Sequence, residues 1–244
     1  MKISLYTLVL PRIELPFLEE WITHNLSLGV DDIFIYNNGY KSMSTEYPTR
    51  KMSEEEQKYK WTKKPDSDYL EHLTDTQIEE GLSKLESIFK DKVKIISWVC
   101  GTDHNDKYPK SQITGFKHCV ENNNSDYWLF CDPDEYFVLP IHKTFKTLIS
   151  DEKYKGVGAF WFGPEFYEPR VNNKSINELK TSGIYKRPVG SWVHTKCMSK
   201  SLVKTPIKWA YKYDSIIHKN RSFNGISKHI NKDIGYFKHY TTTR

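Results

Sequence analysis

The sequence has no apolar run near the roughly 18–20 residues that a membrane-spanning helix needs, and its mean hydropathy is −0.67. Glycine and proline are scarce, with 12 and 11 residues in a chain of 244, which excludes collagen-like and linker-like architectures. Internal repeats and low-complexity tracts are also missing. Aromatic residues make up 14% of the chain, which argues against intrinsic disorder. We therefore expect a soluble globular protein, long enough to bury a substantial core.

Cysteine is scarce too, and the four cysteines form neither a CxxC pair nor a zinc-ligand spacing. They are Cys100, Cys119, Cys131 and Cys197. Each lies among apolar or aromatic neighbours, so we expect buried free thiols in a reducing compartment. The short apolar run of the first ten residues is followed by Pro11-Arg12 without a small-residue cleavage site. This pattern favours a first strand over a signal peptide, and a cytoplasmic protein.

The net charge of +5 is distributed unevenly along the chain. Residues 181–244 carry 13 Lys and Arg but only two acids, Asp214 and Asp233, which gives +11. The first 180 residues carry 23 basic and 29 acidic residues, which gives −6. A basic C-terminal quarter suggests an anionic partner such as a phosphate group, nucleic acid or an anionic membrane surface. Solvated lysines in a lysine-rich composition are the alternative explanation.

The periodicity of the apolar residues predicts alternating strands and helices. The expected strands are residues 3–10, 30–36, 93–99 and 127–131, with helices at 15–28, 76–89 and 112–121. Strand, helix and strand within the first forty residues form a βαβ unit, which implies a parallel sheet. Residues 40–75 are polar and are expected to form an inserted loop. Further strands are expected at 160–162 and between 184 and 240.

The most informative motif, Asp132-Pro133-Asp134-Glu135, follows the strand that is apolar on both faces. Such a strand is central in a parallel sheet, and ligands bind at the carboxyl ends of these strands. Carboxylates there must be paired, hydrogen-bonded or bound to a metal. Acids at alternate positions suit one Mg²⁺ or Mn²⁺ ion that also binds phosphate oxygens. An acidic turn containing proline is the alternative, because such turns are common.

Several blocks resemble those of family 2-like and family 92-like glycosyltransferases, in the same order along almost the whole chain. They are Glu-Glu-Trp-Ile-Thr-His-Asn at 19–25, Leu-Gly-Val-Asp-Asp-Ile-Phe-Ile-Tyr-Asn-Asn at 28–38, Gln-Ile-Thr-Gly-Phe-Lys-His-Cys at 112–119, Trp-Leu-Phe-Cys-Asp-Pro-Asp-Glu-Tyr-Phe at 128–137, Phe162-Gly163, Lys-Ser-Leu-Val-Lys-Thr-Pro at 200–206 and His239-Tyr240. The resemblance implies a single α/β domain of GT-A, Rossmann-like fold with a mostly parallel central sheet flanked by helices. Residues 1–139 would form its nucleotide-sugar-binding half, and residues 140–244 its acceptor-binding half with the basic C-terminal region.

The resemblance also implies a metal site for Mn²⁺ or Mg²⁺. Asp132 and Asp134 would hold the ion against the diphosphate of the donor, and a C-terminal histidine would complete the site. His239 is the first choice, because Arg244 follows five residues later and is placed to meet a phosphate. His218 is the second choice, and an ordinary hydrogen-bonded histidine is the alternative for both.

Donor contacts are expected from the ends of the first two strands and from the basic C-terminal quarter. The candidates are Arg12, Glu14, Asn37, Asn38, Gln112, Lys204 and Arg244. The family has Asn-Glu after its first strand, whereas this chain has Ile13 before Glu14. It also has Asn37-Asn38-Gly39 where the family has an acid, and a simple turn explains these residues equally well.

The resemblance suggests inverting transfer, in which a carboxylate deprotonates the acceptor hydroxyl while the metal holds the departing nucleoside diphosphate. The candidates for this base are Glu165 and Glu168, which lie after the metal motif among aromatic residues. These aromatic residues are suited to stacking on sugar rings, and core packing explains them equally well.

The leading hypothesis is a metal-dependent glycosyltransferase that moves a sugar from a nucleotide-sugar donor, expected to be UDP-linked, to a hydroxyl of a glycan or glycoconjugate. A non-catalytic protein that binds nucleic acid or another polyanion is the alternative, although no nucleic-acid-binding motif is found. A phosphohydrolase or nuclease is a third hypothesis, but it normally needs more clustered carboxylates. We expect no nucleic-acid partner, and peripheral association with an anionic membrane surface stays open.

Overall fold

The computed structural model of the chain describes residues 1–38, 73–98, 110–169, 184–186, 200–204 and 226–240. Four of its strands form a parallel sheet in the order β3-β2-β1-β4. These strands are β1 (Ile3–Val9), β2 (Asp32–Asn37), β3 (Val93–Ser97) and β4 (Tyr127–Phe130). The order is that of a Rossmann-type half-sheet, whose ligands bind at the carboxyl ends of the strands.

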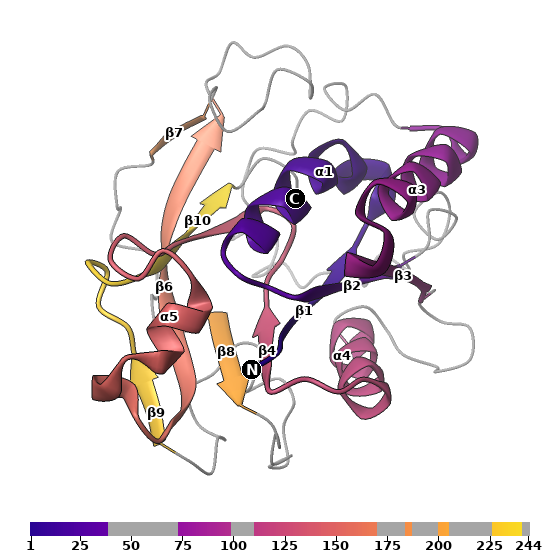
Figure 1. The fold of residues 1–244 in the computed structure, drawn as a ribbon. Helices are drawn as coiled ribbons and strands as arrows, with labels where there is room; N and C mark the ends of the chain where they lie inside the picture. The colour runs from indigo at the N-terminus through magenta and orange to yellow at the C-terminus, as the bar shows by residue number, and fades with distance from the viewer. Residues whose placement is uncertain (39–72, 99–109, 170–183, 187–199, 205–225, 241–244) are drawn as a thin grey trace, which may run out of the picture.

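Helices cover both faces of this sheet (Figure 1). The helices α1 (Pro11–Ser27) and α3 (Asp75–Phe89) lie on one face, and α4 (Lys110–Asn122) lies on the other. Strand β1 is buried along its whole length. Its alternate residues enter two separate core clusters: Leu5 belongs to the cluster that contains Trp21 of α1, and Tyr6 packs against Phe116 of α4 in the other. A parallel sheet covered on both faces requires such continuous apolar strands.

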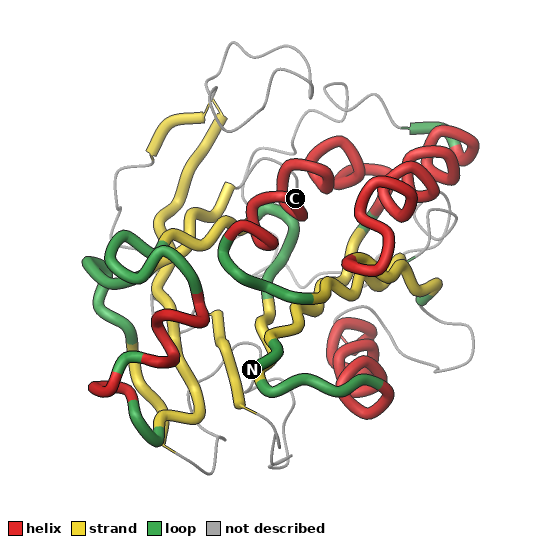
Figure 2. The backbone as a smooth tube through the Cα atoms, in the orientation of Figure 1, coloured by secondary structure: helices red, strands yellow, loops and turns green. Residues whose placement is uncertain are grey.

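A second group of strands continues the sheet beyond β4 in the order β8-β6-β10-β5, and β7 and β9 pair with β6 (Figure 2). These elements are β5 (Glu135–Val138), β6 (Val157–Pro169), β7 (Ile184–Lys186), β8 (Lys200–Lys204), β9 (Ile226–His229) and β10 (Tyr236–Tyr240). The helix α5 (Phe145–Ser150) and the short 3₁₀ helices Lys90–Lys92 and Glu152–Tyr154 complete the described elements.

The expected α/β class, with a parallel central sheet flanked by helices, is confirmed. Among the helices the largest difference is at the start of α1, which begins at Pro11, whereas the helical period predicted a start near residue 15. Proline is well tolerated in the first turn of a helix, where its missing N–H has no helical partner to lose. The Glu14 carboxylate accepts a hydrogen bond from the Leu10 amide at 2.6 Å, which braces this first turn against the end of β1.

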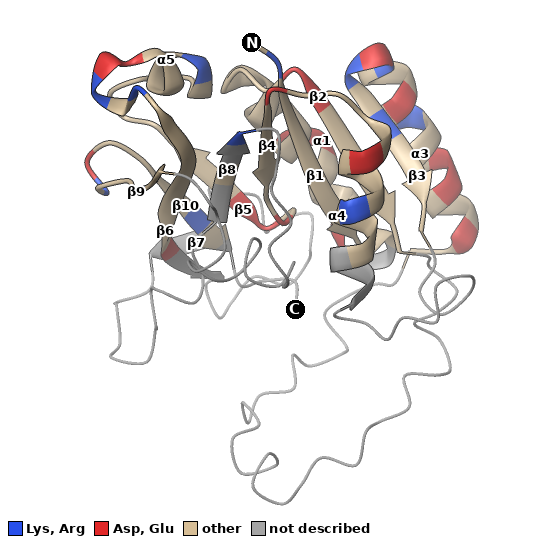
Figure 3. Ribbon diagram, turned by 90° about the horizontal axis from the view of Figure 1, so that it is seen from below, with Lys and Arg blue, Asp and Glu red and all other residues tan. Residues whose placement is uncertain are grey.

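Acidic residues gather along α3 (Figure 3). Its exposed acids are Asp75, Glu79, Glu80 and Glu86, while Ile78, Leu82 and Leu85 are buried. This helix therefore accounts for part of the negative charge of the first 180 residues. None of the helices in the described part of the chain is both long and apolar enough to span a membrane.

Asp31, just before β2, ties three elements together. Its Oδ2 accepts a hydrogen bond from the Ile3 amide at 2.9 Å, and its Oδ1 lies 2.6 Å from Nζ of Lys146 on α5. Although partial burial by itself raises the pKa of this carboxyl, the Lys146 ammonium and the Ile3 amide together hold the pKa below its usual value. The ionised carboxylate therefore favours the folded state.

Replacing Asp31 by Asn is expected to lower the free energy of unfolding by about 1–2 kcal/mol at pH 7. The contribution of a carboxyl whose folded pKa is depressed is present above its unfolded pKa of about 3.9 and is lost as the pH falls through the folded value. Urea unfolding of both proteins between pH 7 and pH 2.5 checks this. A difference that stays constant below pH 4 would contradict it.

Candidate functional site

The motif after β4 forms a tight, buried turn that leads directly into β5. The Glu135 amide donates to the Asp132 carbonyl at 3.0 Å, and the Asp132 amide donates to Oε2 of Glu135 at 2.9 Å. Asp132, Asp134 and Glu135 are 9%, 6% and 1% exposed. Three buried carboxylates within four residues repel one another unless hydrogen bonds or a cation compensate.

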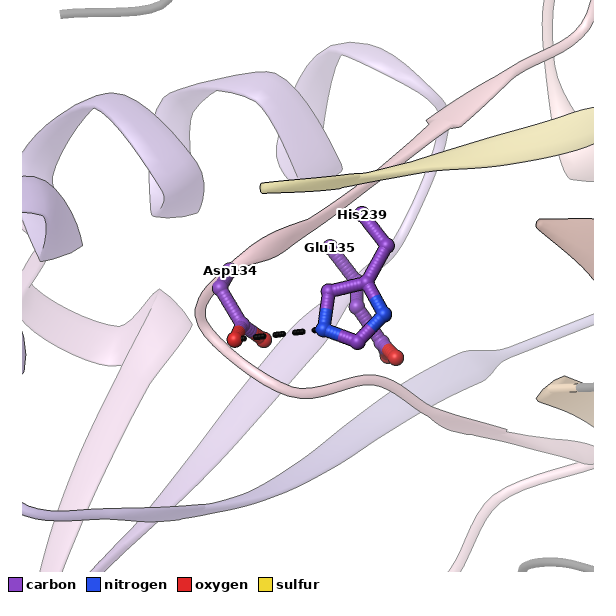
Figure 4. A group of neighbouring side chains, drawn as sticks. All are labelled: Asp134, Glu135 and His239. Carbon is purple, nitrogen blue, oxygen red and sulfur yellow. Dashed lines mark ion pairs between the residues drawn. The ribbon is translucent and has the colours of Figure 1, made fainter. Parts of the chain in front are cut away.

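A histidine from the far end of the chain joins this turn. Strand β10 pairs with β5 in antiparallel fashion and places His239 directly opposite Glu135, so their side chains share one face of the sheet. Nε2 of His239 lies 3.4 Å from Oδ2 of Asp134 (Figure 4). One ligand atom from each of Asp134, Glu135 and His239 lies within 4.8 Å of the others. We call these three residues the carboxylate–histidine cluster.

The cluster fits a divalent metal ion. Oδ1 of Asp134 is buried and receives no hydrogen bond from the residues that the structure describes, so a carboxylate oxygen is left uncompensated. Two carboxylates and an imidazole offer mixed oxygen and nitrogen ligands. Mg²⁺ takes oxygen ligands almost exclusively, whereas transition metals also accept imidazole. Of the two ions expected from the sequence, the ligand set therefore favours Mn²⁺.

Glu135 was not among the metal ligands predicted from the sequence, and Asp132 was. Asp132 is not a member of the cluster found among the described residues. It lies near Tyr6 instead: burial raises the pKa of Tyr6 well above its usual value, and the Asp132 charge adds to that rise. The sequence contained the signal for Glu135, because the acids at 134 and 135 are adjacent. Glu135 was left out of the predicted ligand set because that prediction considered only acids at alternate positions.

The structure does not bring Glu165 to the cluster. Strand β6 runs parallel to β10, and Glu165 is in register with Lys238, one residue before His239. Neighbouring residues of a strand point to opposite faces, so Glu165 faces away from His239. Its buried carboxylate forms an ion pair with Lys232. Glu168 lies further along β6, opposite Tyr185 of β7.

Four of the expected donor contacts lie at or just after the ends of β1 and β2, at the carboxyl edge of the sheet where the Asp132 turn also lies. Arg12 and Glu14 belong to the first turn of α1. Asn37 ends β2, and the amide of the buried Asn38 donates to the Val9 carbonyl at 3.0 Å. The carboxylate of Glu14 is engaged by the Leu10 amide, so its role in the folded chain includes bracing this edge.

The remaining candidates are placed differently. Gln112 lies in the first turn of α4. Lys204 is exposed and pairs with Tyr127 at the start of β4, because β8 runs antiparallel to β4. Lys204 therefore lies at the edge of the sheet opposite the Asp132 turn. His218 and Arg244 lie outside the described residues.

No family model and no curated protein sequence matches the chain. Among solved structures, it is similar to residues 1–349 of TarS from S. aureus, with 14% identity and a TM-score of 0.34 over 72% of this chain and 38% of that one. TarS has also been solved with UDP-GlcNAc. The chain thus spans well under half of this structure.

Two further solved structures align with this chain over almost the full length of both chains. CMP:2-keto-3-deoxy-manno-octonic acid synthetase with CTP has 9% identity and a TM-score of 0.38, over 99% of this chain and 90% of that one. UDP-glucose pyrophosphorylase with UDP-glucose has 10% identity and a TM-score of 0.37, over 100% and 92%. With TM-scores below 0.5, these likenesses are too weak to assign a family or an activity.

Proposed function

We propose that the chain is a metal-dependent glycosyltransferase with a GT-A fold, similar to families 2 and 92, that uses a UDP-linked sugar and a glycan or glycoconjugate acceptor. The observation that carries the proposal is the carboxylate–histidine cluster at the carboxyl edge of a parallel sheet. Its buried Asp134 oxygen has no donor among the described residues. Parallel α/β sheets bind nucleotides at this edge.

Asp134 and His239 would hold the metal ion, and Glu135 would complete the ligand set from the neighbouring strand position. When bound, a divalent ion neutralises the charge of the departing diphosphate. Asp132 lies in the same turn and is proposed to contact the donor as well. Asn37 and Asn38 at the end of β2 flank the same edge.

In this proposal residues 1–139 bind the donor, His239 completes the metal site, and the rest of residues 140–244 bind the acceptor. Inverting transfer requires a carboxylate base on the acceptor side. Glu165 faces away from His239 and is paired with Lys232, so Glu168 is the better candidate for this base.

A thermal-shift titration with UDP and UDP-sugars, with and without Mn²⁺, tests the proposal. A ligand present at about 100 times its dissociation constant adds about 2.7 kcal/mol of stability. For a chain of this size the midpoint of thermal unfolding is expected to rise by about 5–10 °C when metal and nucleotide are both present, and by less with either one alone. Equal stabilisation without Mn²⁺ would contradict a metal-bridged diphosphate.

Heparin provides the comparison for the alternative function. Stabilisation by heparin that weakens steeply with salt, combined with no effect of nucleotides, would favour a polyanion-binding protein. For the proposed transferase, the nucleotide effect should survive at 200 mM salt, because buried ligands are screened less than surface charges.

A further inference from the structure

The outer edge of β5 is closed by side chains of α1. Strand β5 is the last strand in the order of the sheet. Nε1 of the fully buried Trp21 donates to the Glu135 carbonyl at 2.9 Å. Three residues further along α1, Nε2 of His24 lies 2.8 Å from the Phe137 carbonyl. Two side chains of one helix thus bind alternate carbonyls of one strand and replace a further strand partner.

The spacing of these contacts follows from the two kinds of backbone. Residues 21 and 24 are about 4.5 Å apart along a helix axis, and carbonyls 135 and 137 are about 6.6 Å apart along a strand. The aromatic side chains of the two helix residues are long enough to make up the difference between these two spacings. Burial lowers the pKa of His24, so its ring is neutral at pH 7, and Nε2 is the donor because a carbonyl can only accept.

The Glu135 carbonyl receives a second donor from inside the turn. Sγ of Cys131 lies 3.1 Å from it and 3.4 Å from the Asp132 carbonyl, so the shorter contact of this thiol is to Glu135. The amide and the carboxylate of Glu135 are bound to Asp132, as described above. The amide, the carbonyl and the carboxylate of Glu135 are therefore all held by hydrogen bonds. Asp134 immediately precedes this residue, and His239 lies opposite it in the register of the sheet.

We propose that Trp21 is a positioning residue of the metal site, which acts through the Glu135 carbonyl. Its indole N–H fixes the backbone from which Asp134 and Glu135 extend, and thereby the distance from both carboxylates to His239. This inference rests on the proposed metal-dependent function. A phenylalanine ring at this position would fill part of the same space but could donate no hydrogen bond to the Glu135 carbonyl, so the Trp21→Phe substitution removes the N–H contact in addition to some packing.

The test is the Mn²⁺ affinity of Trp21→Phe, measured from the electron paramagnetic resonance signal of free Mn²⁺ with the full chain. Changes in residues that orient metal ligands typically weaken binding by 10–100-fold, so we expect the dissociation constant to rise about 10-fold. In turnover assays, the variant should need more Mn²⁺ for half-maximal rate and should regain most of the wild-type kcat at saturating Mn²⁺.

The matched control is Trp128→Phe, in a tryptophan that is also buried but belongs to the core cluster on the α4 face. It should lose a similar amount of stability and keep the wild-type Mn²⁺ affinity. If both folded variants bind Mn²⁺ like the wild type, the inference is overturned and the proposed function stands. If the wild type itself binds no Mn²⁺, both the inference about Trp21 and the proposed function are contradicted.

Cys131→Ala keeps the inference testable if Trp21→Phe does not fold. It removes the other donor to the same carbonyl without changing an aromatic ring. A thiol is a weak donor, so we expect a smaller rise of about 3-fold in the dissociation constant. A wild-type affinity in this variant would then contradict the role assigned to the Glu135 carbonyl.

Discussion

Replacing Asp134 by Asn is expected to reduce metal-dependent sugar transfer by about 10³-fold or more. The substitution keeps the shape of the side chain but removes the charge that faces His239 and that would hold the proposed cation. Loss of a directly coordinating carboxylate removes several kcal/mol of transition-state stabilisation, and each 1.36 kcal/mol is a factor of ten in rate. Release of UDP from a UDP-sugar, followed with and without acceptor, measures the effect.

The matched control for this prediction is Asp233→Asn, in an exposed acid of the turn that precedes β10. It should keep the wild-type rate. Without metal, Asp134→Asn should unfold within about 1 kcal/mol of the wild type, because it removes a buried charge without opening a cavity. Full activity of Asp134→Asn would remove the cluster from the mechanism.

Replacing Phe116 by Ala is expected to lower the free energy of unfolding by about 3–5 kcal/mol. Phe116 is fully buried on α4, with its ring centroid 4.0 Å from that of Phe130 and 5.6 Å from that of Tyr6. It holds α4 against the two central strands β1 and β4. The loss combines the transfer of a large ring to water with an unfilled cavity.

Urea unfolding of Phe116→Ala and Phe116→Leu measures this effect. Leucine fills most of the site, so its cost should be less than half that of alanine. A loss below 1 kcal/mol in Phe116→Ala would mean that α4 does not form the second core layer. A partly unfolded variant would show a lower slope of unfolding free energy against urea.

The parallel half of the fold was predictable because its signals are local. Strand β1 is a continuous apolar run, α1 has helical periodicity, and the two strands β2 and β4 end in turn-forming residues. The early start of α1 was not predicted, because Pro11 signals both the end of a strand and the first turn of a helix. Its role depends on the Glu14 carboxylate that closes the first turn.

The second half was harder to predict for physical reasons. Strand β5 has four residues and follows the acidic turn without a break, so no period is long enough to detect. Strand β6 spans 13 residues, whereas the sequence predicted only a short strand at residues 160–162. It changes partners along its length, from β8 and β9 to β10 and β7. Such changes depend on pairing with distant residues.

In the candidate site, too, some features were predictable from local sequence and others depend on the pairing of distant strands. The acidic turn and His239 stand out in the sequence, and the structure brings Asp134 and His239 together. The inclusion of Glu135 depends on the register between β5 and β10. The orientation of Glu165 depends on the register between β6 and β10. A shift of one residue in either register would move Glu135 away from His239 or turn Glu165 toward it. No local sequence pattern determines these registers.

Anomalous diffraction from crystals of the full chain grown with Mn²⁺ and UDP would locate the metal ion and its ligands. We expect one strong manganese peak within about 2.0–2.3 Å of an oxygen of Asp134 and a nitrogen of His239, with the diphosphate oxygens completing the shell. A peak held by other residues, or UDP bound at the carboxyl edge of the sheet without manganese, would contradict it.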